Sequence, residues 1–78
     1  MKNKNQKEDI NVLFGQNIKR IRLSKKISQE KLGEIANLHR TYIGMIERGE
    51  KNITLINIGK LSKALGISIE SLFSGIDD

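Results

Sequence analysis

Two short helical segments joined by only two residues constrain this fold more than any other feature of the sequence. The apolar period predicts one helix over 29–36 and a second over about 40–48, with Asn37 and Leu38 between them. So short a connection needs one residue in the left-handed region, which Asn adopts more readily than any residue except Gly. The two helices must then cross nearly at a right angle, and the start of the second helix protrudes.

The apolar positions of these two segments predict how they pack. We expect the first helix to bury Leu32, Ile35 and Ala36, and the second to turn Ile43 and Ile46 inward. Gly33 has no side chain, so it should let the second helix approach the first closely.

Three further helices are predicted from apolar period and caps. Phe14, Ile18 and Ile21 recur at helical spacing and predict a helix over 9–25. Ser28, Thr54 and Ser68 are each suited to cap a helix, and apolar residues flank each cap as a hydrophobic staple; the pairs are Ile27 with Leu32, Ile53 with Ile58, and Ile67 with Leu72. Leu38 and Ile43 form the same staple around His39, which we expect to be a poor cap. Gly49 and Gly66 are placed to end the third and fourth helices in the left-handed conformation. The fold class expected is all-α with five helices, as one domain over 9–76 after a flexible N-terminal tail over 1–8.

The charge of the chain is concentrated around the helical corner. The net charge is +5, and residues 16–51 carry nine Lys or Arg against four Glu, a difference of five that accounts for the whole excess. Such a basic segment fits binding to nucleic acid, and it equally fits a solvated surface kept for solubility. The chain has no Cys, so it has neither disulfides nor thiolate metal sites. Without a leader or an apolar run of membrane-spanning length, we expect a soluble cytoplasmic protein.

The protruding start of the third helix carries side chains that its own fold does not need. Arg40 lies in the first turn, where the helix dipole disfavours a cation, so we expect it to serve a ligand. Its guanidinium matches guanine O6 and N7, Thr41 can contact a base, and Tyr42 can reach phosphate or sugar. Gln29 opens the preceding helix, whose N-terminus favours an anion, so it is expected to clamp a DNA phosphate.

These motifs resemble the Cro/lambda-repressor helix-turn-helix (XRE) family. The resemblance rests on Gln29, a small residue at position 33, the turn at 37–38, Ile43 and Ile46, together with IKRIR (18–22) and IERG (46–49), and it covers about 14–73. LHRTYI (38–43) and IERGEKN (46–52) look most like controller proteins of restriction-modification systems, small dimeric regulators that activate and repress promoters. The sequence departs from the family in having Gly33 in place of alanine and Asn37 in place of glycine.

The resemblance implies roles for four more residues and a set of partners. Arg22 and Glu47 would form a buried ion pair, although both could also be surface residues. Arg48 and Asn52 would contact phosphate, although as loop residues they could equally be solvated. The implied partners are double-stranded DNA and a second copy of the chain, and RNA polymerase is a further candidate.

Five other residues are candidates for a contact role. His39 has no second ligand at metal spacing, so it is interpreted as a turn residue that touches backbone or phosphate. Met45 should face outward, where it either contacts a thymine methyl or stays partly exposed. Ile69, Phe73 and Ile76 form an apolar row at helical spacing that suggests a dimer interface, unless Phe73 simply closes the core.

The function predicted from these observations is sequence-specific regulation of transcription by a homodimer on a palindromic operator, as a restriction-modification controller. A phage-type repressor or an antitoxin-like protein-interaction module on the same fold are the alternatives. No nucleophilic triad, paired carboxylates or phosphate-binding glycine loop is present, so neither an enzyme, a cofactor nor a metal site is expected.

Overall fold

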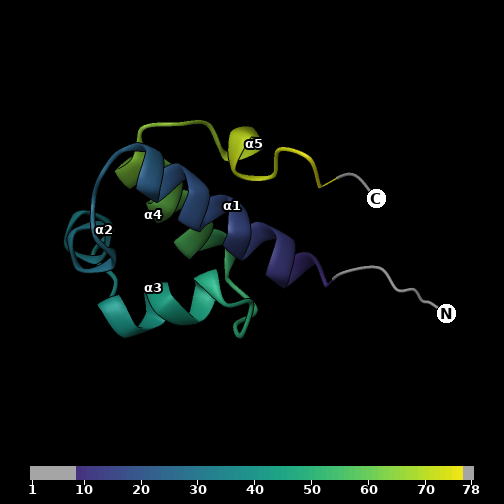
Figure 1. Ribbon diagram of the computed structural model, residues 1–78, viewed down its shortest axis with the longest axis horizontal. Coiled ribbons are helices and arrows are strands. Elements are labelled where there is room, and N and C mark those ends of the chain that lie inside the picture. Colours follow the sequence, from purple (N-terminus) through teal and green to yellow (C-terminus); the bar gives the residue numbers. More distant parts are fainter. Residues whose placement is uncertain (1–8, 77–78) are drawn as a thin grey trace, which may run out of the picture.

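The computed structural model describes residues 9–76, and this part of the chain forms five helices without a strand, which confirms the predicted all-α fold. They are α1 (Ile10–Ser24), α2 (Gln29–Ala36), α3 (Arg40–Glu47), α4 (Leu55–Leu65) and α5 (Ile69–Leu72). In Figure 1, α1 crosses the middle of the molecule with α3 on one side, α5 on the other and α4 behind it. The predicted tail, residues 1–8, lies outside the described residues. None of the helices described is long and apolar enough to span a membrane.

One contiguous hydrophobic core receives side chains from all five helices. Its buried members are Phe14, Ile18, Ile21, Leu32, Ala36, Ile43, Ile46, Ile58, Leu61, Leu65 and Leu72. The helix α1 packs on both α3 and α5, while α2 packs on α3 and α4. The corner made by α2 and α3 is therefore supported on two sides and can hold the start of α3 at the surface.

The predicted caps are present at three helix starts. The hydroxyls of Ser28, Thr54 and Ser68 accept hydrogen bonds from the backbone N–H groups three residues later, at 2.9, 3.1 and 3.1 Å. The apolar residue before each cap packs against the core, as the staple pattern predicts. Each cap thus fixes the direction in which the chain enters its helix.

The prediction that His39 is a poor cap was wrong. Its Nδ1 accepts a hydrogen bond of 3.0 Å from the backbone N–H of Thr41. An imidazole ring can do this only when Nδ1 is unprotonated, which leaves the Nε2–H as the donor of the ring. His39 therefore replaces a hydroxyl or carboxylate cap and keeps a donor at the start of α3.

The tight corner between α2 and α3 is formed as the sequence predicts, with one correction. Asn37 has φ 59° and ψ 47°, the left-handed conformation expected of it. A Cβ at Gly33 would collide with the carbonyl oxygen of Leu38, so the close approach of the two helices requires glycine. Ile35, predicted to be buried, is 50% exposed. Because α2 turns Leu32 and Gly33 toward its neighbours, Ile35 is left at the edge of the packed face.

The predicted apolar row on the last helix is not a single helical face. The helix α5 ends at Leu72, and Gly75 reverses the chain with φ 78°. The ring of Phe73 packs on Phe14 with ring centroids 4.9 Å apart, as the alternative interpretation expected, while Ile76 is partly buried and Ile69 half-exposed. The side-chain amide of Asn17 donates to the carbonyls of Leu72 and Ser74, at 3.0 and 2.9 Å, and so ties this segment to α1.

Two glycines in helix interiors allow a matched test of the α1–α3 contact. A Cβ at Gly15 would overlap the backbone carbonyl of Ile46 and lie 2.9 Å from that of Glu47, whereas a Cβ at Gly59 would meet nothing within 4 Å. Gly15→Ala should lower the free energy of unfolding by about 1–3 kcal/mol through overpacking. Gly59→Ala should raise it by about 0.5–1 kcal/mol through helix propensity. Urea denaturation at one protein concentration measures both, and equal stabilities would show that the contact is not tight.

Candidate nucleic-acid interface

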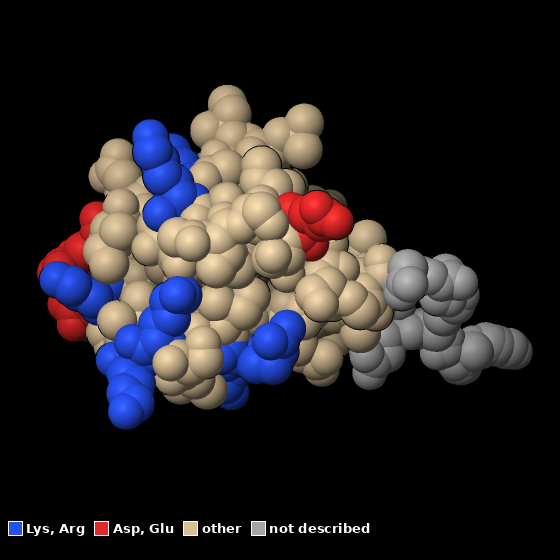
Figure 2. All heavy atoms as spheres, turned by 90° about the horizontal axis from the view of Figure 1, so that it is seen from above, with Lys and Arg blue, Asp and Glu red and all other residues tan. Residues whose placement is uncertain are grey.

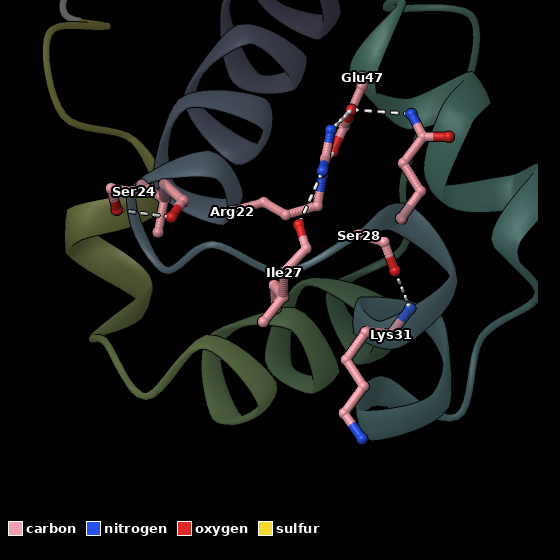
Figure 3. A network of polar contacts seen from close by, with 8 residues as sticks. Arg22, Ser24, Ile27, Ser28, Lys31 and Glu47 are labelled. Atoms are coloured by element: carbon pink, nitrogen blue, oxygen red, sulfur yellow. Dashed lines mark hydrogen bonds and ion pairs between the residues drawn. The ribbon is translucent and has the colours of Figure 1, made fainter.

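A buried ion pair joins the first helix to the end of the third. Arg22 Nε lies 2.7 Å from Glu47 Oε2, and Arg22 Nη2 lies 3.1 Å from Glu47 Oε1 (Figure 3). The two side chains are 8% and 3% exposed. The remaining nitrogen, Nη1, donates to the carbonyl of Ile27 at 2.9 Å. The pair implied by the family resemblance is therefore confirmed, with the guanidinium held on three sides.

The same carboxylate also holds the first residue of α2. The side-chain amide of Gln29 donates to Glu47 Oε1 at 3.0 Å, and Gln29 is half-buried. Each oxygen of Glu47 thus accepts a charged or polar hydrogen bond, which is what burial of a carboxylate requires. Because Glu47 lies at the end of α3, this network fixes α1, α2 and α3 relative to one another. Gln29, which is expected to clamp a phosphate, is therefore held in a fixed position by this network.

The first turn of α3 presents exposed polar side chains, as predicted. Arg40 and Thr41 are exposed, and the Arg40 side chain keeps 66% of its surface accessible. Its only ion pair among the described residues is a long one, 3.9 Å from Nη1 to Glu30 Oε1, between two exposed groups. Such a pair contributes little, so the guanidinium is free to bind another partner.

The third residue of this turn, Tyr42, is held from behind by α4. Its phenol oxygen accepts a hydrogen bond of 3.0 Å from the side-chain amide of Asn57, and the ring packs against the core. With this acceptor site filled, the phenol proton remains available to a ligand. Asn57 is not predictable from the sequence, because no local pattern links a residue in the first turn of α4 to one in α3.

The loop after α3 carries the remaining predicted contact residues. Arg48 is paired with Glu50, at 2.9 Å from Nε to Oε2 and 3.2 Å from Nη2 to Oε1. This hydrogen bond is the main reason why the pKa of the Glu50 carboxyl is lowered. The Oδ1 of Asn52 accepts a hydrogen bond of 2.6 Å from the side chain of Asn11, which ties the loop to α1. Both predicted contact residues are exposed.

The structure brings most of the predicted contact residues onto one side of α3. Thr41, Met45 and Arg48 follow one another at helical spacing, opposite Ile43 and Ile46, which are buried. Met45 is partly exposed, which is one of the two outcomes predicted for it. His39 and Arg40 precede this row at the start of α3, and the amide of Gln29 lies beside it near Gly44. Together these residues form the candidate interface.

The charge on the opposite side of the molecule is unevenly distributed. Figure 2 views the molecule from the side on which α5 lies, with α3 on the far side. Lys and Arg side chains lie at the lower and upper left of this face, Asp or Glu side chains lie just to the right of its middle, and uncharged side chains fill the area between them. The uncharged area is thus separate from the polar side chains of α3.

Comparison with known proteins identifies relatives over most of the chain. The helix-turn-helix family matches residues 18–72. The chain is 55% identical over 65 residues to control protein C.BamHI of Bacillus amyloliquefaciens, which covers 82% of this chain and 80% of that protein. It is 44% identical over 66 residues to control protein C.SmaI of Serratia marcescens. That match covers 85% of this chain and 79% of C.SmaI. Its fold matches the crystal structure of the restriction-modification controller protein C.AhdI from Aeromonas hydrophila with a TM-score of 0.80 and 44% identity, covering 81% of this chain and 96% of that one.

Removing one partner of the buried ion pair should destabilise the protein more than removing both. Glu47→Leu leaves the Arg22 guanidinium buried and unpaired, so the free energy of unfolding should fall by about 3–5 kcal/mol. The double variant Arg22→Met with Glu47→Leu should recover most of that loss, because no uncompensated charge remains. Urea unfolding followed by circular dichroism measures both. If the double variant were as unstable as the single one, the loss would not come from the unpaired charge.

Proposed function

The chain belongs to the helix-turn-helix family, and we propose that it is a sequence-specific DNA-binding transcriptional regulator of a restriction-modification system. Its match to two control proteins over about four fifths of their length supports this assignment. Such a regulator binds double-stranded DNA, and we propose that it acts in the cytoplasm. The observation that carries the proposal is the exposed guanidinium of Arg40 on a helix anchored by a buried ion pair.

Arg40 and Thr41 are the proposed base-reading residues. The start of α3 enters the major groove, where the Arg40 guanidinium can donate two parallel hydrogen bonds to guanine O6 and N7. Discrimination by such a pair requires a fixed helix, because a displaced guanidinium would lose one of the two bonds. The Arg22–Glu47 pair supplies that rigidity from behind the helix. Met45, one turn farther along, can contact a thymine methyl.

The remaining interface residues are proposed to bind the DNA backbone. Gln29 lies at the N-terminus of α2, where backbone N–H groups and the helix dipole favour a phosphate. The Tyr42 hydroxyl, oriented by Asn57, and the Nε2–H of His39 are further neutral donors at the start of α3. Arg48 and Asn52 extend the phosphate contacts beyond α3. Such contacts set the position of the protein on the duplex, and they carry no sequence information.

We propose that the regulator acts as a homodimer through the surface around α5. Ile69 is half-exposed, and Phe73 and Ile76 are partly buried beside it. The uncharged area in the middle of the face in Figure 2 suits contact with a second copy. A two-fold dimer would place two copies of α3 about 34 Å apart, so the operator should be a palindrome with half-sites about 10 bp apart.

Selection of bound duplexes from random DNA tests the function directly. The expected product is a palindromic consensus, and the affinity for it should fall steeply as the salt concentration rises. A reporter gene placed behind that consensus then measures whether the protein represses transcription or, through contact with RNA polymerase, activates it. Recovery of random sequences with equal affinity would contradict sequence-specific regulation.

Arg40→Ala should separate base reading from folding. The variant should keep its helical circular dichroism and thermal midpoint, since the side chain is exposed. Its affinity for the selected operator should fall by about 1–3 kcal/mol, with much less change on scrambled DNA. Lys63→Ala, which removes an exposed cation from α4, is the matched control and should retain the preference for the operator. Unchanged preference in Arg40→Ala would reject α3 as the reading helix.

Ile69→Lys should weaken the dimer. The added charge would be buried in an apolar contact, so the dissociation constant of the dimer should rise roughly tenfold or more. Leu23→Lys changes an equally exposed apolar residue of α1 and should leave the dimer unchanged, because Leu23 lies outside the proposed surface. Sedimentation equilibrium measures both variants. Equal dimerisation of Ile69→Lys and the wild type would place the interface elsewhere.

A further inference from the structure

The chain leaves α3 through a tightly bonded turn that fixes the position of Glu50. Gly49 has φ 77°, its N–H donates to the carbonyl of Ile46 at 3.0 Å, and the N–H of Glu50 donates to that of Met45 at 2.9 Å. These two bonds form a Schellman motif, which ends α3 with Gly49 in the left-handed conformation. A Cβ at Gly49 would lie 2.7 Å from Cγ2 of Val12, so α1 packs closely against the turn. The backbone of Glu50 is therefore held in place relative to α3.

The Glu50 carboxylate binds Arg48 in the way that a phosphate would. Two hydrogen bonds, from Nε and Nη2 of Arg48, run to the two carboxylate oxygens at 2.9 and 3.2 Å. Phosphate oxygens accept from a guanidinium with the same two-bond geometry. The side chains are 58% and 49% exposed, so an incoming anion can reach the guanidinium.

The Arg48 guanidinium lies over the outward side of α3. A Cβ at Gly44 would come within 3.2 Å of Arg48 Nη1 and within 3.6 Å of Gln29 Oε1. The missing side chain at Gly44 thus gives the guanidinium room beside the proposed phosphate clamp. Arg48 and Gln29 can therefore approach the same stretch of DNA backbone.

Glu50 stands at a position that the helix does not favour. An anion just beyond the C-terminus of a helix faces the negative end of its dipole, whereas Arg48 is favoured there. Its side chain is not buried and contributes nothing to the core. The contact that Glu50 makes is with Arg48, a residue proposed to bind DNA.

We propose that Glu50 is an intramolecular competitor for the phosphate-binding site of Arg48. In the free protein the carboxylate occupies the guanidinium edge, and on DNA a backbone phosphate replaces it. The inference rests on the proposed DNA-binding function. An exposed pair of this kind is weak enough to be displaced, yet it lowers the affinity for DNA by a measurable factor.

A double-mutant cycle on the selected operator tests this competition. Glu50→Gln keeps the size of the side chain and removes its charge, and it should raise affinity about two- to fivefold. In an Arg48→Gln background the same change should have no effect, because the site for which Glu50 competes is gone. Glu34→Gln removes a carboxylate that is also exposed, 65% against 49% for Glu50, and paired with Lys31 on α2, and it should leave affinity nearly unchanged. Fluorescence anisotropy at one salt concentration measures all four variants and the wild type, after circular dichroism has shown equal folding.

The outcomes separate this inference from the proposed function. If Glu50→Gln also raised the affinity for DNA in the Arg48→Gln background, the effect would be general charge repulsion, and the proposed competition would be overturned. Unchanged or lower affinity of Glu50→Gln would also overturn it. If the wild type bound no duplex DNA at all, the proposed function would fail first and the competition with it. A gain that appears only when Arg48 is present supports the proposal.

Discussion

The buried pair of Arg22 and Glu47 is the interaction on which the rest of the structure depends. Burying two charges is costly, and the cost is offset only because every side of the pair is bonded, by the Ile27 carbonyl and the Gln29 amide as well as by the partners themselves. These bonds join the end of α1, the start of α2 and the end of α3 at one point (Figure 3). A helix fixed in this way can present a side chain to a ligand without moving when the ligand arrives. The same hydrogen bonds therefore keep α3 rigid and satisfy the buried charges of Arg22 and Glu47.

Two charged residues near the ends of α3 do not suit the isolated helix. Arg40 places a cation at the positive end of α3, and Glu50 places an anion beyond its negative end. Elsewhere in the chain caps, staples and left-handed residues all agree with the fold, so these departures stand out as functional choices. His39 agrees with the fold, because its ring nitrogen caps α3.

Much of the fold followed from local pattern, and the errors arose where tertiary packing decides. Ser28, Thr54 and Ser68 predicted three helix starts because a cap and its staple lie within a few residues of one another. Ile35 fits the helical period of α2, but the rotation of α2 depends on how closely α3 approaches Gly33. Ile69, Phe73 and Ile76 fit one helical row, but α5 ends at Leu72, and Asn17 bonds the carbonyls of Leu72 and Ser74. Asn57 could not be found, since its role exists only where α4 meets Tyr42.

The sequence by itself determined the five helices, the corner at Asn37, the surface position of Arg40 and the family to which the chain is similar. These depend on period, caps and backbone preference, all of which act over a few residues. Only the tertiary structure decided which side chains support the interface. Gln29 donates to Glu47, Asn57 donates to Tyr42, and Glu50 accepts from the guanidinium of Arg48. The first two bonds join different helices, and the third depends on how the turn after α3 directs its side chains. The geometry of the first two bonds is set by the packing of the core, which no local pattern encodes.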